Sequence, residues 1–327
     1  MAEKFNKISS QKIIRAVSVV ISFGILVLIY FKIDLKSLAN IFKDCNIPWL
    51  IISLLMFIPT TLMTCIRFKQ LLPPKVKTRF SDIIGLILSA STMNMFLPSK
   101  MGDIVKSYFM KNNFGINGPF SLTVVIFEKT CDLLSLLVLC LAGLLTHPVN
   151  PRLFWVFTGI ILFGLIFGFI ILSSRIFAKL FFTLLYNIVP KKFKKNIGNF
   201  SDSWYEVQDF FFKNKIKLFA IAVNSIFIWF LHLLQFWFFI FALKSYVPFF
   251  KNLALSSLSI LAGLLPLTFA GIGTRDAAII YFYTPFFNSE VGAAIGILAT
   301  SRYLIPAIIG IPFFGKYLSG IKINKKK

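Results

Sequence analysis

The 327-residue sequence has few charged residues, and few of these are acidic. Asp and Glu together number 12 against 35 Lys and Arg, while 57% of the chain is hydrophobic and 40 residues are Phe. A soluble domain needs a far more polar surface, so the composition predicts an all-α polytopic integral membrane protein. The basic residues lie between apolar runs, which favours anionic lipid headgroups, and not nucleic acid, as their partner.

Motifs for catalysis and metal binding are also missing. The sequence contains no nucleophile elbow, Walker loop, zinc-protease helix or dinucleotide-binding turn. The four cysteines have no metal or redox spacing. We therefore predict no catalytic residue, no metal and no cofactor. Asp34, in the first predicted outer loop, could mimic the loop aspartate of membrane glycosyltransferases, but we interpret it as a solvated interfacial residue.

Charge placement predicts the topology. Residues 67–79 and 175–217 are strongly basic and should face the cytoplasm, as should both termini. A full crossing by residues 83–97 would put residues 175–217 outside, so we predict a re-entrant hairpin at residues 82–111. A second hairpin at residues 252–287, which enters from the opposite side, resolves the same conflict near the C-terminus. Two full crossings at residues 252–270 and 279–287 are the alternative, but the second is too short to span.

About six full transmembrane helices are expected beside the two hairpins. Their predicted ranges are residues 16–31, 47–66, 119–146, 153–174, 218–243 and 291–317. We predict one membrane domain, residues 1–327, made of inverted halves 1–146 and 147–327. Residues 175–217 form a cytoplasmic linker. It contains an amphipathic helix with apolar residues at helical spacing from Ile197 to Phe211.

Each predicted hairpin has a backbone break formed by Pro and Gly, next to opposite charges. The first contains Asn94, Pro98, Lys100, Gly102, Asp103 and Lys106, and the second contains Pro266, Gly271, Gly273, Arg275 and Asp276. Broken backbone at membrane depth is tolerated only where protein or a water-filled cavity covers it. Two interrupted segments in corresponding halves indicate a transporter's binding site.

Further charges lie inside predicted spans. Glu128 and Asp132 are roughly 14 and 20 Å along their helix from Pro119, and Arg302 is roughly 17 Å along the last span. An ionisable group at such depth costs about 3 kcal/mol or more unless it is paired or hydrated. Arg302 paired with Asp132 or Glu128 could simply lock two spans together. For the whole set we favour a polar cavity, in which basic groups suit a phosphate and carboxylates suit a cation or a proton.

Taken together, these motifs resemble the lysylphosphatidylglycerol synthase transmembrane-region family of flippase-like membrane proteins. The resemblance is carried by Asn94, Pro98, Gly102, Asp103, Lys106, Glu128, Asp132, the run from Gly271 to Asp276, and Arg302. The family's second motif usually ends in Arg-Glu, where this chain has Asp276. The family includes the membrane half of the multiple peptide resistance factor, which moves aminoacylated phosphatidylglycerol between leaflets. The aminoacyl-transferring part of that factor is a separate soluble domain, which we expect to be absent here.

The resemblance and the charges together predict flippase-like translocation across the cytoplasmic membrane. The expected substrate is an anionic or aminoacylated phospholipid or another lipid-phosphate carrier. The alternatives are a phosphatidylglycerol lysyltransferase-type enzyme, a membrane subunit of lipid aminoacylation or lipid-linked glycosyl transfer, and a small-solute secondary transporter. The expected partner is a membrane phospholipid or lipid-linked substrate, and a homo-oligomer or a separate soluble enzyme is left open.

Overall fold

The computed structural model describes residues 33–96, 102–146, 151–265 and 271–324, with Gly24, Val27 and Thr268. Every regular element in this part of the chain is helical. Four helical stretches are long and apolar enough to cross a membrane: residues 47–71, 154–173, 215–242 and 289–315. The all-α, multi-pass membrane class is therefore confirmed. Apart from Gly24 and Val27, which are helical, the predicted span at residues 16–31 lies outside the described residues.

Helix α2 (Leu35–Lys43) precedes the first described crossing. The Asp34 carboxylate caps it, accepting from the Lys36 N–H at 3.0 Å and from the Ser37 hydroxyl at 2.5 Å. The Ser37 hydrogen bond, followed by that from Lys36, lowers the pKa of Asp34. The structure thus gives Asp34 a helix-capping role.

The first described crossing is interrupted. Helices α3 (Ile47–Leu55) and α4 (Phe57–Leu71) meet at Met56. Pro59, in the first turn of α4, has no N–H to donate to a carbonyl of α3, which accounts for the break. Helix α4 ends at Leu71, beyond the predicted boundary at residue 66, so Arg67 lies inside the helix rather than in a loop.

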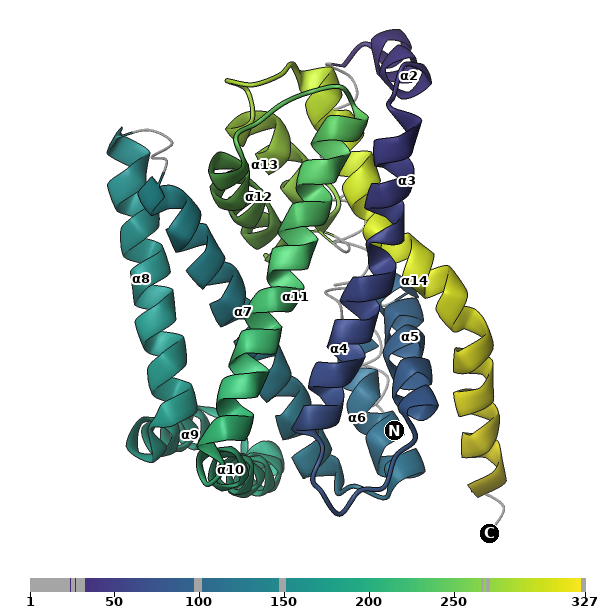
Figure 1. Ribbon diagram of the computed structural model, residues 1–327. Helices are drawn as coiled ribbons and strands as arrows, with labels where there is room; N and C mark the ends of the chain where they lie inside the picture. Colours follow the sequence, from purple (N-terminus) through teal and green to yellow (C-terminus); the bar gives the residue numbers. More distant parts are fainter. Residues whose placement is uncertain are drawn as a thin grey trace.

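Two pairs of shorter helices occupy the two predicted hairpins. Helix α5 (Phe80–Phe96) packs against α6 (Gly102–Phe114), and α12 (Phe249–Leu264) packs against α13 (Thr274–Phe282). In Figure 1, α5 and α6 lie in the lower part of the molecule and α12 and α13 in the upper part. The two pairs therefore occupy opposite ends of the bundle.

The remaining long helices are α7 (Gly118–Thr146), α8 (Pro151–Ser173), α11 (Lys215–Ala242) and α14 (Ser289–Asn324). Helix α5 packs along α14, and α12 packs along α7, so each pair of shorter helices leans on a long helix of the other half. A glycine permits both approaches: a Cβ at Gly310 would collide with the Leu88 carbonyl of α5, and one at Gly143 would lie 2.5 Å from the Ala254 nitrogen of α12. Small residues of this kind allow helices in membranes to pack closely.

Helices α9 (Arg175–Ile188) and α10 (Lys191–Phe212) lie across the lower end of the bundle (Figure 1). The apolar face predicted for residues 197–211 is turned inward, because Trp204, Val207 and Phe211 are buried against α9 and α7. The Phe211 ring stacks on Phe127 of α7, with centroids 4.6 Å apart. Helix α10 thus links α9 to the middle of the bundle.

Candidate functional site

A cavity of about 190 Å³ lies among helices α4, α5, α6, α7, α11 and α14. Its lining comes from the middle of the long helices. At 1.5 Å per residue, Thr60, His232 and Arg302 lie about 20, 26 and 20 Å from the starts of their crossings. These three residues lie in the middle of their crossings, while Arg67, which also lines the cavity, is four residues from the end of α4.

Arg67 is at the centre of an ion-pair network on one side of the cavity. It is buried, and its Nη2 donates to Glu128 Oε1 at 2.8 Å. Its Nη1 pairs with the Asp132 carboxylate and donates to Ser225 Oγ at 3.1 Å. The Trp229 indole N–H also donates to Asp132, at 3.2 Å. One guanidinium thereby holds both carboxylates of α7 and connects α4, α7 and α11.

Two lysines extend the network to the start of α6. Lys106 Nζ lies 3.0 Å from Glu128 Oε2 and 3.1 Å from Asp103 Oδ1. Lys129 Nζ bridges Asp103 at 3.0 Å and Asp132 at 3.3 Å, and its side chain is 46% exposed. Lys129 and Asp132 are three residues apart on α7 and pair across one turn of the helix. All three carboxylates of the cavity are neutralised by basic groups of the chain itself.

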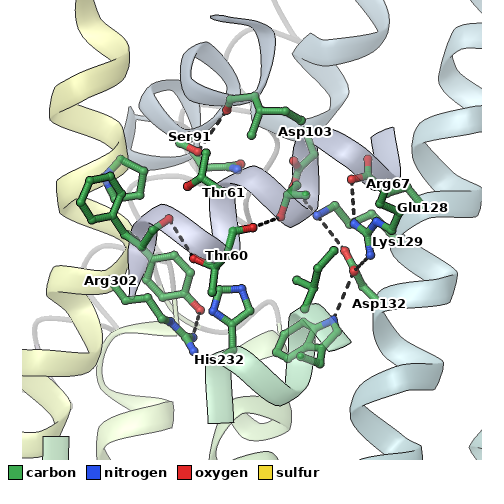
Figure 2. A pocket seen from close by; sticks show the side chains of 18 of the residues that line it. Thr60, Thr61, Arg67, Ser91, Asp103, Glu128, Lys129, Asp132, His232 and Arg302 are labelled. Carbon is green, nitrogen blue, oxygen red and sulfur yellow. Dashed lines mark hydrogen bonds and ion pairs between the residues drawn. The ribbon is translucent and has the colours of Figure 1, made fainter. Parts of the chain in front are cut away.

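Arg302 lies on the opposite side of the cavity, together with His232 (Figure 2). Its residue is only 4% exposed, and its guanidinium contacts the Tyr303 hydroxyl. Among the described residues, no carboxylate pairs with Arg302, and its buried Nε and Nη1 find no hydrogen-bond acceptor. The suggested pairing of Arg302 with Asp132 or Glu128 is therefore not formed, because Arg67 occupies that position.

Local sequence also exposes the backbone beside Arg302. Pro306 follows it by one helical turn and lacks an N–H, so the helical bond to the Arg302 carbonyl is missing. Pro306 lines the cavity with Arg302 and Tyr303. One helical hydrogen bond of the otherwise continuous α14 is thus missing at the cavity wall.

The charged lining has more positive than negative groups. The basic members are Arg67, Lys106, Lys129 and Arg302, and the acidic members are Asp103, Glu128 and Asp132. With every group ionised, one positive charge is in excess, and Arg302 is the cation without an ion-pair partner in the described chain. Burying an unpaired charge is costly, so the arrangement favours an anionic ligand.

The charges of the second hairpin are used differently. Arg275 donates to Asp276 Oδ1 from Nε at 3.0 Å and from Nη2 at 2.7 Å. Nη2 also donates to the Gly296 carbonyl at 2.9 Å and to the Thr300 hydroxyl at 2.8 Å. Asp276 in turn accepts from the Gly273 N–H at 3.0 Å. We call this set the Arg275 clamp; it fastens the start of α13 to α14 and does not line the cavity.

Glycines make the turn before the clamp possible. Gly271 and Gly273 have φ angles of 75° and 98°, values that residues with a Cβ rarely adopt. A Cβ at Gly271 would also lie 2.6 Å from the Gly263 carbonyl oxygen of α12. The predicted backbone break after α12 is present in the described part of this segment.

The cavity brings together most of the predicted binding residues. Those that line it are Asn94, Asp103, Lys106, Glu128, Asp132 and Arg302. Gly102 packs against the backbone of α5 near Asn94, which brings Asp103 close to the lining. Arg275 and Asp276 lie in the clamp instead. Pro98, Lys100 and Pro266 lie outside the described residues.

Comparison with known proteins identifies the family of the chain. The sequence model of the lysylphosphatidylglycerol synthase TM region matches residues 15–310. The chain belongs to this family. A UPF0104 membrane protein of Methanocaldococcus jannaschii is 23% identical to this family member, over 94% of this chain and 96% of the relative. The matched region includes the whole cavity lining and the Arg275 clamp.

Sequence reasoning missed one central residue of this lysylphosphatidylglycerol synthase TM protein. Arg67 was assigned to a basic loop because the hydrophobic run appeared to end at residue 66. The overlooked signal is helical spacing: Cys65, Phe68, Leu71 and Leu72 continue the buried face of α4 beyond Arg67. A lone arginine within such a face is a candidate for an intramembrane ion pair.

Proposed function

We propose that this protein translocates a lipid between leaflets, and that its cavity binds the phosphate of the headgroup. The observation that carries the proposal is Arg302, a buried guanidinium at the cavity wall whose Nε and Nη1 have no acceptor among the described residues. A guanidinium stays positively charged and donates several N–H hydrogen bonds, for which phosphate oxygens are strong acceptors. A phosphate would also neutralise the excess positive charge of the lining.

The network on the other side of the cavity suits a second task. Arg67 and Lys106 are buried and hold Glu128 from both sides, which fixes the wall facing Arg302. Lys129 is much more exposed and bridges two carboxylates. We propose that this side positions the remainder of the headgroup by contacts to Lys129, Asp103 and Asp132, while Arg302 holds the phosphate.

We also propose an inverted repeat with re-entrant hairpins α5–α6 and α12–α13. Packing supports it: α5 on α14 corresponds to α12 on α7, and α6 on α7 corresponds to α13 on α14. The hairpins lie at opposite ends of the bundle (Figure 1). The basic end with α9 and α10 is assigned to the cytoplasm of the cell membrane, with both termini on that side.

Reconstitution tests the lipid-translocation proposal directly. Purified protein in vesicles of phosphatidylcholine and phosphatidylglycerol should move fluorescent phosphatidylglycerol to the opposite leaflet, measured by chemical quenching of the outer leaflet. Arg302→Ala should lower the rate by about tenfold or more, since hydrogen bonds to a charged group contribute about 1.5–3 kcal/mol. The melting temperature should not fall, because no ion pair is broken.

Arg175→Ala serves as the matched control. Arg175 pairs with Asp209 on the exposed surface of the α9–α10 segment, and neither residue lines the cavity. The control should translocate lipid at the wild-type rate. Full translocation by folded Arg302→Ala protein would contradict the phosphate site, and no translocation by wild-type protein would contradict the function. Mass spectrometry of lipids that copurify with the protein would identify the headgroup.

A further inference from the structure

A second hollow lies at the lower end of the bundle, outside the cavity. It is a groove of about 940 Å³ between the α4–α5 connection and the start of α11. Four basic residues line it, and no acidic residue does: Lys69, Lys77, Arg79 and Lys217. Three of them are exposed and form no ion pair with a described carboxylate. The groove therefore concentrates positive charge from two separate parts of the chain.

Lys217 is held in place within this groove. Its ammonium donates to the Leu72 carbonyl at 3.3 Å and lies 4.3 Å from the centroid of the Phe210 ring. Pro73 and Pro74 restrict the backbone of the facing connection. The basic groups are consequently presented by restrained backbone on both sides, which lowers the entropy lost when an anion binds.

A series of polar contacts connects the groove with the cavity along the seam between α4 and α11. After the Lys217–Leu72 contact, Asn224 Nδ2 donates to Gln70 Oε1 at 2.9 Å. The adjacent residue on α11, Ser225, accepts from Arg67 of the cavity network at 3.1 Å. Gln70 lines the groove and Arg67 lines the cavity, one turn apart on the same helix. The groove and the cavity are thus neighbours joined by polar side chains.

We infer that this groove is a docking site for the phosphate headgroup of an anionic lipid before it reaches the cavity. The inference rests on the proposed function. The groove carries positive charge without carboxylates, as binding an anion requires. It lies beside the end of α4 and the start of α11, at one end of the bundle, and its polar seam leads to Arg67. The headgroup binds through Lys69, Lys77 and Arg79, with Lys217 at the start of the seam.

Concentration dependence separates docking from translocation. The variant Lys69→Gln, Lys77→Gln, Arg79→Gln is reconstituted in phosphatidylcholine vesicles with an increasing fraction of phosphatidylglycerol. We expect the half-saturating fraction to rise about tenfold or more, because each of the three basic residues near an anionic surface strengthens binding by up to about fivefold. The maximal rate should stay within about twofold of wild type. The control Lys179→Gln, Lys213→Gln, Lys215→Gln removes three exposed charges from the same end of the bundle and should leave both values unchanged.

Direct contact is measured with a photocrosslinking amino acid in place of Thr78, which lines the groove. Phosphatidylglycerol should crosslink in the wild-type background and not in the triple variant. An unchanged half-saturating fraction in the triple variant, with Arg302→Ala still slowed as expected, would overturn the docking site and leave the proposed function intact. If the wild-type protein does not translocate lipid, but crosslinks to phosphatidylglycerol and loses this crosslink in the triple variant, the docking site is supported and the proposed function is overturned. If inorganic phosphate abolishes crosslinking, and crosslinking does not depend on the phosphatidylglycerol fraction, the ligand is a soluble phosphate and the lipid assignment is overturned.

Discussion

The starts of α6 and α13 carry similar short motifs: Gly-Asp followed by Lys at α6, and Gly-x-Arg-Asp at α13. The charged side chains of the two motifs nevertheless have different roles. At α6, Asp103 and Lys106 join residues of α4 and α7 around a cavity. At α13, Arg275 donates to Asp276 and to the backbone of α14, away from the cavity. The same kind of hairpin thus supplies a cavity wall in one half of the chain and a structural clamp in the other.

The facing long helices explain this difference. Helix α7 presents two carboxylates, Glu128 and Asp132, to the start of α6, so lysines and Arg67 gather there. Helix α14 presents the Gly296 carbonyl and the Thr300 hydroxyl to Arg275, which are neutral acceptors at close range. Where the long helix offers carboxylates the ion-pair network extends over several helices, and where it offers neutral acceptors the Nε and Nη2 groups of the arginine are bonded locally, while its buried Nη1 has no acceptor among the described residues. A motif therefore acquires its role from the helix that it meets.

The largest expected effect breaks the network of the first hairpin. Arg67→Met leaves Glu128 and Asp132 buried without their shared guanidinium, and should lower the free energy of unfolding by about 3–5 kcal/mol. Thermal and denaturant unfolding in detergent measure the loss. Adding Glu128→Gln should restore part of the stability. Arg175→Met, at the exposed pair with Asp209, should cost less than about 1 kcal/mol; an equal cost at both sites would remove the distinction between a buried network and a surface pair.

A smaller effect is expected from the clamp of the second hairpin. Arg275→Lys keeps the charge but cannot reach Asp276, Gly296 and Thr300 together, and should cost about 1.5–3 kcal/mol of stability. Lipid translocation per folded molecule should be unchanged. Arg302→Lys is the comparison, since it should slow translocation while the melting temperature holds. If Arg275→Lys slows translocation at an unchanged melting temperature, Arg275 belongs to the substrate path. The contrast between a binding role at α6 and a structural role at α13 would then be wrong.

The smallest expected effect concerns Gly296, the residue of α14 against which Asp276 of the Arg275 clamp packs. A Cβ at Gly296 would lie 2.9 Å from Asp276 Oδ1, so Gly296→Ala should push the clamp away from α14. Overpacking costs about 1–3 kcal/mol and is offset by up to about 1 kcal/mol of helix propensity. Gly159→Ala on α8, where nothing lies within 4 Å of the new Cβ, should be neutral or stabilising. The difference between the two melting temperatures measures the contact, and equal values would show that the clamp is loosely seated.

Helices with a continuous apolar run could be predicted closely. The span predicted at residues 153–174 corresponds to α8, and the span predicted at residues 218–243 to α11, because length and hydrophobicity alone define such helices. The end of α4 was placed too early because a charged residue was taken as a boundary. Burial of Arg67 depends on Glu128 and Asp132, more than sixty residues further along the chain. Local sequence carries no information about such a partner.

The candidate site was predicted as a set of residues, but not as an arrangement. Depth in a span identified Glu128, Asp132 and Arg302, since charges there are rare and costly. The rotation and crossing angles of the helices decide which of these residues form ion pairs. In the structure, Arg67 pairs with both carboxylates, and Arg302 lines the cavity without a carboxylate partner among the described residues. Arg275 has the same residue type and a more conspicuous motif, yet its Nε and Nη2 donate to Asp276 and to neutral acceptors on α14, away from the cavity. The re-entrant path of both hairpins stays a prediction.

The packing of α5 on α14 has a consequence for biosynthesis. Gly310 and Ala307, which receive α5 and the Thr92 hydroxyl, are translated roughly 200 residues after α5. At about 5–20 residues per second, α5 waits on the order of 10–40 seconds for its partner. During that interval α5, with Ser89 and Thr92 on its polar face, has been synthesised, but α14, which packs along α5, has not. The newborn chain must therefore shelter α5 in the insertion machinery, or against earlier helices, until its last long helix arrives.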